Sequence, residues 1–212
     1  KDGPGGKGSN QAIAAARAGG DARMITRIGR DTFGEMAQKA WAADGIDTSA
    51  VVIDQTLTTG AAFIFVSTET GNNAIIVESG AAANLSPADV AAAERTIVTS
   101  KVLMTQFEQP VPTAIAGLKL ARQHGVTTIL NPAPAVTVTD EIYGLCDYVT
   151  PNETEAATLT GLKVETEADA LLAAKDFVRR GARNALITLG EKGALLHGAV
   201  GTFMVPAFKI SK

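Results

Sequence analysis

Three glycines surround one lysine in the loop Gly5-Gly6-Lys7-Gly8, which Ser9 and Asn10 follow directly. Glycine adopts backbone angles that other residues avoid and has no Cβ, so the backbone of such a loop can approach a ligand closely. The alanine-rich run 11–18 predicts a helix, whose first turn offers unpaired N–H groups to a polar or anionic guest. The segment is therefore a candidate ligand-binding loop, and a plain helix entry is the alternative.

Two common phosphate-binding motifs do not match this loop. A P-loop requires Ser or Thr directly after its Gly-Lys pair, whereas Gly8 follows Lys7 here. The dinucleotide fingerprint requires a third glycine at the position that Gln11 occupies. The loop therefore needs another explanation.

Polar residues also stand at a predicted strand end and at a predicted helix start. Glu108 follows the predicted strand 101–106, and a carboxylate there can accept hydrogen bonds from two sugar hydroxyls; an ordinary polar strand end is the alternative. Asn152 precedes Glu155 by three residues, the spacing of a helix-capping pair. The same spacing places both side chains on one rim, where a hydrated Mg²⁺ needs only one or two protein carboxylates.

The segment Thr188-Leu189-Gly190-Glu191-Lys192-Gly193 is a strand end that breaks into a glycine turn. A plain hairpin leading into 194–197 would explain it, and a loop that lines a ligand site is the other interpretation.

The elements that would position these residues alternate along the chain. Apolar runs predict strands over 22–28, 101–106, 126–130, 147–150 and 184–189, and helical spacing predicts helices over 32–43, 111–124, 140–145, 153–159 and 167–180. Ser86-Pro87-Ala88-Asp89 is typical of a helix start. Such alternation predicts an α/β fold with a parallel sheet and helices on both faces, with ligands at the carboxyl ends of the strands.

One region breaks the alternation. The β-rich segments 61–67 and 73–78, joined by Glu69-Thr70-Gly71-Asn72, predict a hairpin within about 51–80 that lies outside the central sheet as a flap. We otherwise expect residues 1–212 to form a single domain, because no linker or low-complexity segment interrupts them.

Composition excludes several classes of protein. Hydrophobic residues make up 46% and charged residues 19% of the chain, which are globular values, and no apolar run approaches the ~20 residues that span a bilayer. A net charge of -3 without a basic stripe argues against nucleic acid as the main partner. The single cysteine, Cys146, favours a reducing cytoplasm, and we expect it to be a small core residue rather than a nucleophile.

The glycine loop is followed by Gly19, by Ile28-Gly29, and by Asp31 with Gly34. This register resembles the first signature of the ribokinase-like carbohydrate kinases, and Asn131-Pro132-Ala133-Pro134 with the Asn-x-x-Glu pattern at Asn152 resembles the ribokinase branch most. The resemblance implies a Rossmann-like sheet with a small β lid, and ATP-dependent phosphorylation of the primary hydroxyl of a ribose-like sugar. It also implies Mg²⁺, a monovalent cation such as K⁺, and a homodimer formed through the lid.

The resemblance assigns roles to individual residues. It implies that the sugar is held by Gly5, Gly6, Lys7, Asn10 and Glu108. It implies that the nucleotide is held by Asn152, Thr188, Gly190, Glu191, Lys192 and Gly193, and the metal by Glu155 and Asn152.

The chain departs from the family's pattern at its ends. Family members carry a first strand with a sugar-binding Asn and Asp before the glycine loop, and later an Asp-Thr-x-Gly-Ala-Gly-Asp motif whose final Asp accepts the proton of the sugar hydroxyl. Only Lys1 to Pro4 precede the loop here, and Lys212 comes before any such motif. We therefore expect a chain truncated at both ends, with its catalytic base beyond Lys212 and no turnover alone. The alternatives are a fructose, nucleoside or sugar-phosphate kinase of the same family, and a non-catalytic sugar or nucleotide binding protein.

Overall fold

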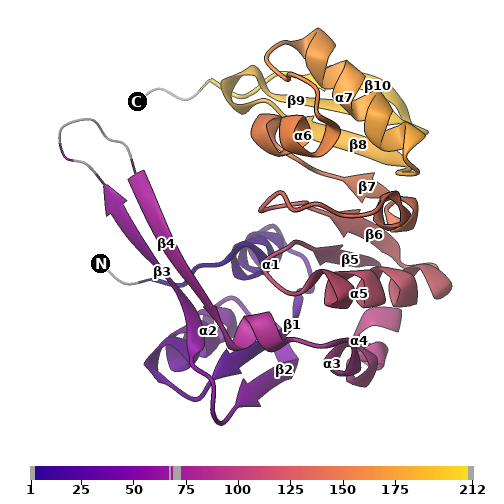
Figure 1. The fold of residues 1–212 in the computed structure, drawn as a ribbon. Coiled ribbons are helices and arrows are strands. Elements are labelled where there is room, and N and C mark those ends of the chain that lie inside the picture. Colours follow the sequence, from indigo (N-terminus) through magenta and orange to yellow (C-terminus); the bar gives the residue numbers. More distant parts are fainter. Residues whose placement is uncertain (1–2, 67, 69–72, 210–212) are drawn as a thin grey trace. The chain divides into compact units, whose positions relative to one another are not determined.

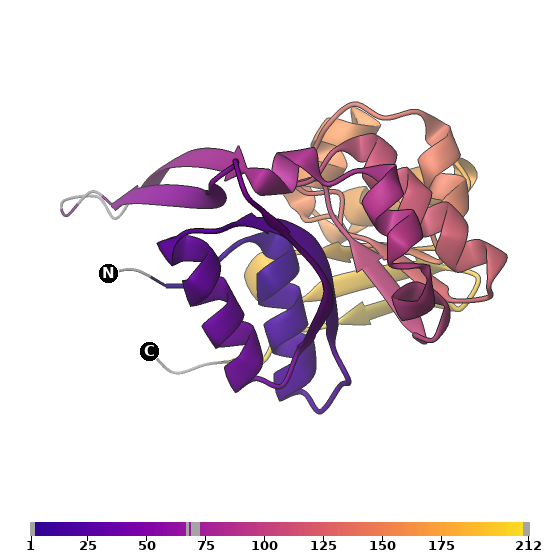
Figure 2. The same cartoon turned by 90° about the horizontal axis from the view of Figure 1, so that it is seen from below.

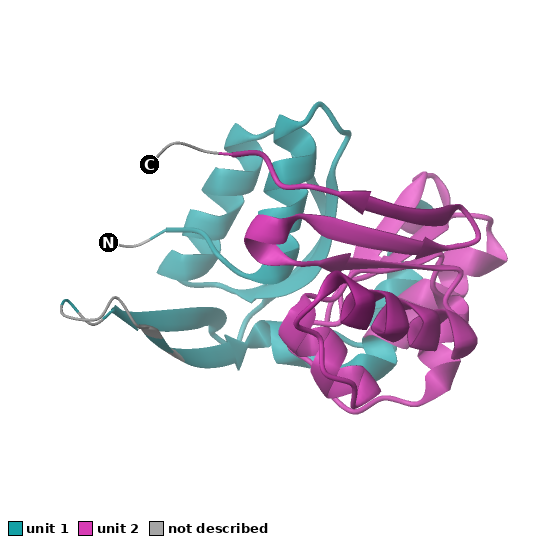
Figure 3. Cartoon of the chain, turned by 90° about the horizontal axis from the view of Figure 1, so that it is seen from above, with its two compact units in different colours: residues 1–96, 108–113 teal, residues 97–107, 114–212 magenta. Residues whose placement is uncertain are grey.

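The computed structural model describes residues 3–66, 68 and 73–209. These residues form two compact units, which Figure 3 colours separately: residues 1–96 with 108–113, and residues 97–107 with 114–212. Each unit is described by itself. The expectation of a single domain with one appendage stays a prediction.

The first unit is built on two short parallel strands covered by helices. Its elements are α1 (Lys7–Arg17), β1 (Arg23–Gly29), α2 (Thr32–Ala43), β2 (Asp47–Asp54), β3 (Thr59–Val66), β4 (Asn73–Gly80), η1 (Ala81–Asn84) and α3 (Pro87–Ala92). The strands β1 and β2 pair in parallel, and Figure 2 shows α1 and α2 side by side. Met24, Ile28, Trp41 and Ile46 form the buried core between them.

The predicted hairpin is formed by β3 and β4, which pair in antiparallel fashion as a separate two-stranded sheet (Figure 1). The predicted turn residues 69–72 lie outside the described residues. Large apolar side chains along the hairpin are between 55% and 63% exposed: Phe63, Ile64, Phe65, Val66, Ile76 and Val77. Neighbouring side chains on a strand point to opposite faces, so both faces of the hairpin carry apolar groups.

The base of the hairpin is tied to the start of α2 by Asp31. Its Oδ1 caps α2 by accepting from the Gly34 N–H (2.8 Å), and its Oδ2 accepts from the Thr59 N–H (2.7 Å). Partial burial acts to raise the pKa of Asp31, but these hydrogen bonds outweigh it and leave the pKa below its usual value. The hydroxyl of Thr59 in turn accepts from the Gly29 N–H (2.9 Å). Asp31 therefore connects β1, α2 and β3.

The second unit contains a six-stranded sheet in the order β10-β9-β8-β7-β6-β5. Its strands are β5 (Val102–Thr105), β6 (Thr127–Leu130), β7 (Tyr148–Val149), β8 (Asn184–Thr188), β9 (Ala194–Gly198) and β10 (Gly201–Val205). Its helices are α5 (Val111–Gln123, whose first turn belongs to the first unit), η2 (Asp140–Leu145), α6 (Glu153–Thr160), α7 (Glu167–Arg179) and η3 (Gly190–Lys192). The short helix α4 (Glu94–Val98) crosses from one unit to the other.

This architecture confirms the predicted α/β fold class. The strands β5 to β8 are parallel, and α6 and α7 pack against each other and against β8 (Figure 1). The sheet continues with the antiparallel strands β9 and β10, and the pairing of β8 with β9 is the hairpin that was one interpretation of residues 188–197. One feature differs from the sequence-based expectation, because β2 forms over a segment for which no strand was expected. The segment 140–145 is a 3₁₀ helix.

Candidate active site

The glycine loop ends at the N-terminus of α1, and the carboxylate of Glu108 lies against it. Gly6 caps the helix with φ 88°, in the region that favours glycine, and Lys7 begins the helix. The backbone N–H of Lys7 donates to Glu108 Oε2 at 2.7 Å. A carboxylate at this end of a helix is favoured by the helix dipole. One of the N–H groups that the sequence offered to a ligand is therefore bound by a side chain 101 residues away.

A buried hydrogen bond fixes the first turn of α1. The indole Nε1 of Trp41 in α2 donates to Ser9 Oγ at 2.8 Å, and both residues are buried. Gly5, Asn10 and Glu108 remain exposed around this anchored turn. The structure thus gathers all five predicted sugar-binding residues in the first unit, and it directly joins two of them, Lys7 and Glu108. Their roles toward a sugar stay a prediction.

In the second unit, the start of α6 meets the end of β8. Asn152 forms a parallel bridge with Thr188, and the Thr188 N–H donates to the carbonyl of Pro151 at 3.1 Å. Both segments lie at the carboxyl ends of neighbouring parallel strands, β7 and β8, where ligands of α/β sheets collect. The structure therefore brings together Asn152 and Thr188, which the sequence predicted as nucleotide-binding residues from separate motifs.

Asn152 and Glu155 form a reciprocal capping box at the start of α6. Asn152 Oδ1 accepts from the Glu155 N–H (2.8 Å), and Glu155 Oε2 accepts from the Asn152 N–H (2.9 Å). The capping interpretation of this pair is thus met by the geometry. The pair keeps groups that the capping box does not use. The Asn152 amide has N–H donors for a phosphate, and Glu155 has a second carboxylate oxygen.

This donor set suits a hydrated Mg²⁺. Mg²⁺ keeps several waters and is bound through one or two carboxylates together with substrate phosphates, so Glu155 alone suffices on the protein side. In the described ranges, no three side chains of His, Cys, Asp or Glu come close enough to share a metal ion. A dedicated all-protein metal cage is therefore not the arrangement seen in this part of the chain.

The segment after β8 is a tight turn held by two glycines. Gly190 and Gly193 have φ 54° and 109°, and a Cβ on Gly193 would lie 2.0 Å from the carbonyl oxygen of Val205. The Leu189 N–H donates to the Gly193 carbonyl at 2.8 Å, and the turn leads into β9. Lys192 Nζ donates to the carbonyl of Glu165 at 2.6 Å. Glu191 is exposed.

Asn131 is a site residue that sequence reasoning treated only as a flank of the motif. Its Nδ2 donates to the carbonyl of Thr150 at 2.8 Å, and its backbone N–H donates to the carbonyl of Thr105. It therefore joins the ends of β5, β6 and β7 next to the start of α6. The signal was available in the sequence, since Asn131 is the first polar residue after a buried strand.

Two expectations about other residues can be compared with the structure directly. Cys146 is 1% exposed, and burial raises the pKa of its thiol to about 12, which leaves it protonated and unreactive near neutral pH. Among the residues that the structure describes, none of the helices is long and apolar enough to cross a membrane.

Comparisons with known proteins identify the family. The whole chain, residues 1–212, matches the pfkB family carbohydrate kinases. A bifunctional ribokinase/ribose-5-phosphate isomerase A of Fructilactobacillus sanfranciscensis is 43% identical over 204 residues, covering 96% of this chain and 38% of that protein. A ribokinase of Staphylococcus aureus is 39% identical over 207 residues, covering 98% of this chain and 68% of that protein.

Solved structures agree with these relatives. A structure of Arabidopsis thaliana ribokinase complexed with ribose and ATP matches with a TM-score of 0.89 at 25% identity. The match covers 98% of this chain and 68% of that chain. The chain thus spans between 38% and 68% of the length of the proteins named here. The chain belongs to the pfkB family of carbohydrate kinases.

Proposed function

We propose that the protein of which these residues form part is an ATP-dependent kinase that phosphorylates the primary hydroxyl of a ribose-like sugar. The observation that carries the proposal is the contact between Lys7 N–H and Glu108 Oε2, because it joins the two segments from which the sugar site was predicted. The similarity to ribokinases over 98% of the chain supports the same substrate class. ATP and an unpaired cysteine both suit the reducing cytoplasm, where we place the protein.

At the sugar end, the glycine loop and Glu108 act together. Gly5 and Gly6 leave the backbone open to a ligand, and the exposed Asn10 adds an amide that can donate and accept. Glu108 Oε2 is bound to Lys7, so Oε1 is the oxygen left to accept a sugar hydroxyl. Lys7 supplies the one positive side chain of the loop. A neutral sugar fits this set better than a sugar phosphate, which would call for additional Arg or Lys.

At the nucleotide end, Asn152 donates from its amide to a phosphate, and Glu155 holds the hydrated Mg²⁺ through its remaining carboxylate oxygen. Mg²⁺ neutralises charge on the phosphoryl group during transfer. Thr188 with the turn 190–193 lines the path of the nucleotide beside them. A monovalent cation such as K⁺ remains part of the proposal through the family resemblance alone.

Binding to two single variants tests the assignment. Thermal shift and calorimetry with ribose and with MgATP would compare Glu108→Gln and Asn152→Ala with the unaltered chain. Glu108→Gln should weaken the affinity for ribose by roughly 10-fold to 100-fold, the value of a hydrogen bond to a charged group, and leave the affinity for MgATP unchanged. Asn152→Ala should weaken the affinity for MgATP and leave the affinity for ribose unchanged. If Glu108→Gln binds ribose with unchanged affinity, the assignment of the sugar site to the glycine loop and Glu108 is wrong.

Turnover tests the remaining part of the proposal. The 212 residues contain no Asp-Thr-x-Gly-Ala-Gly-Asp motif, so we expect them to bind both substrates without releasing ADP. A longer chain that contains the motif should release ADP with ribose, and much less with fructose or adenosine. Ribose-dependent ADP release from residues 1–212 alone would contradict the assignment of the base to that motif. Binding of neither ribose nor MgATP would favour a protein without a kinase site.

We propose further that two copies associate through the β3–β4 hairpin. A hairpin with one packed and one solvent-facing surface would alternate apolar and polar side chains, but both faces are apolar here. One face can cover the sugar and the other a second copy. Sedimentation should give twice the 21.8 kDa of this chain. Ile64→Lys should yield monomers, whereas Leu172→Lys, at a similarly exposed apolar position on α7, should leave the dimer intact.

A further inference from the structure

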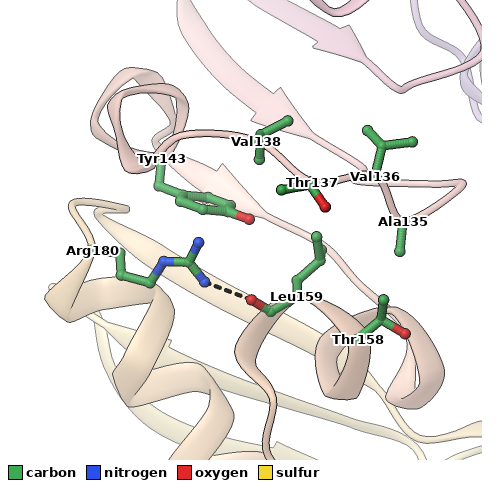
Figure 4. Close-up of a pocket in the computed structure, with 8 residues that line it drawn as sticks. All are labelled: Ala135, Val136, Thr137, Val138, Tyr143, Thr158, Leu159 and Arg180. Atoms are coloured by element: carbon green, nitrogen blue, oxygen red, sulfur yellow. Dashed lines mark hydrogen bonds between the residues drawn. The ribbon is translucent and has the colours of Figure 1, made fainter.

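A pocket of about 170 Å³ lies in the second unit, and none of its lining residues is among those assigned above to a substrate. It is bounded by the loop between β6 and η2, by Tyr143 of η2, by the last turn of α6 and by Arg180 after α7 (Figure 4). Its lining residues are Ala135, Val136, Thr137, Val138, Tyr143, Thr158, Leu159 and Arg180. A cavity of about this volume holds one six-membered ring.

Tyr143 gives this pocket an unused polar group. Its side chain is fully buried, with its ring edge-to-face on Phe177 at 5.3 Å and under the guanidinium of Arg180 at 4.5 Å. Its hydroxyl has no hydrogen-bond partner among the described residues. Figure 4 shows the hydroxyl pointing toward the space between Thr137 and Leu159. A buried hydroxyl without a partner is costly, so a ligand that supplies one is favoured.

The charge of Arg180 is already balanced within the protein. Its Nε donates to Asp140 at 2.6 Å, its Nη1 lies 3.6 Å from Asp176, and the same Nη1 donates to the carbonyl of Leu159 at 2.8 Å. Asp176 also pairs with Arg179 at 2.6 Å, so Asp140 and Asp176 together balance the two guanidiniums of Arg179 and Arg180 and leave no excess positive charge for an anion. The remaining lining combines the hydroxyl-bearing side chains of Thr137 and Thr158 with the aliphatic side chains of Ala135 and Leu159, whereas the side chains of Val136 and Val138 point to the other side of the loop (Figure 4). These features select a neutral guest that carries both an apolar and a polar part.

We propose that this pocket binds a neutral single-ring compound that carries one hydroxyl or carbonyl oxygen, with the oxygen hydrogen-bonded to the Tyr143 hydroxyl. The ring lies against the aliphatic side chains of Ala135 and Leu159, and the ligand oxygen reaches Tyr143 from the side of Leu159, whose side chain is only half-buried. None of the lining residues is a proposed sugar or nucleotide residue, so this proposal does not depend on the proposed kinase activity.

Phenol and benzene are the probes, because they differ by one hydroxyl. Their dissociation constants would be measured by NMR titration of the 212-residue chain, of Tyr143→Phe, and of the control Tyr148→Phe, which alters the other tyrosine of the sequence. The unaltered chain and Tyr148→Phe should bind phenol about threefold to tenfold more tightly than benzene, the value of one hydrogen bond. Tyr143→Phe should bind the two equally.

A second variant covers the case in which Tyr143→Phe perturbs the fold. Ala135→Leu places three more carbons in the pocket and should weaken the binding of both probes by at least about tenfold. Failure of the unaltered chain to bind either probe at millimolar concentration would overturn the proposal. A phenol preference that survives in Tyr143→Phe, or binding that survives in Ala135→Leu, would also overturn it.

Discussion

Gly34 offers a test of how the hairpin is held, because two opposing effects act on its replacement by alanine. It lies in the first turn of α2, where alanine is favoured over glycine by up to about 1 kcal/mol. A Cβ at this position, however, would lie 2.2 Å from the carbonyl oxygen of Gly29 and 2.9 Å from Thr59 Oγ1. The nearer atom belongs to the backbone of β1 and cannot rotate away.

The clash should outweigh the gain in helix propensity. Restoring an ordinary contact of roughly 3.5 Å requires α2 to move by more than about 1 Å, which strains or breaks the hydrogen bonds that join Asp31 and Gly29 to Thr59. Overpacking costs about 1–3 kcal/mol, and each lost hydrogen bond about 0.5–1.5 kcal/mol. After subtracting the propensity gain, we expect Gly34→Ala to lower the free energy of unfolding by about 3 kcal/mol.

Gly117→Ala is the matched control, since Gly117 lies within α5 and a Cβ there meets only the flexible Leu103 side chain at 3.4 Å. Thermal denaturation should show Gly34→Ala melting roughly 6–12 °C below the unaltered chain. Gly117→Ala should melt at the same temperature or a few degrees above it. If both variants were equally stable, the close packing of α2 on β1 and Thr59 would not be a real constraint, and the reasoning would fail.

Two further predictions concern a helix cap and a carboxylate. Asn152→Ala and Thr166→Ala each remove a capping box and should each lower the free energy of unfolding by about 1 kcal/mol, measured by urea denaturation. Only Asn152→Ala should also weaken the affinity for MgATP. If both variants change that affinity equally, Asn152 serves only as a helix cap. The Thr56 N–H, with the Leu57 N–H and the Arg27 guanidinium, lowers the pKa of Asp54 far below its usual value. This ionised form stabilises the fold above pH ~4, the unfolded-state pKa, and its contribution is lost as pH falls further. Asp54→Asn should therefore melt below the unaltered chain at pH 7, and the gap should narrow progressively as pH falls below ~4, whereas a constant gap would contradict the role of the charge.

Local signals in the sequence account for much of the fold. The helix α2 has the predicted bounds because Asp31 provides its cap and Gly45, with φ 68°, follows its end. The direction of β9 and β10 could also have been derived. A parallel crossover needs a dozen or more residues, but only five separate β8 from β9 and two separate β9 from β10. The antiparallel pairing of β8 with β9 is the hairpin that the sequence offered as one interpretation of residues 188–197.

The candidate site was predictable only in part. The spacing of Asn152 and Glu155 is a property of one helix start, so it can be derived from the sequence, and the capping box bears it out. The contact of Lys7 with Glu108 joins residues 101 positions apart, and no local pattern reports it. The same holds for Thr59, which meets Asp31 only because β3 folds back onto α2. Such pairs follow from the topology, which the family resemblance supplied.

The buried thiol has a practical consequence. Cys146 is the single cysteine of the sequence, it is almost fully buried, and its Sγ lies 3.1 Å from the carbonyl oxygen of Ile142. A maleimide can reach it only when the second unit opens, so the rate of its alkylation reports that opening directly. A cysteine introduced at an exposed hairpin position such as Val77 would react far faster. The natural sequence is therefore ready for selective fluorescent labelling without removal of its own thiol.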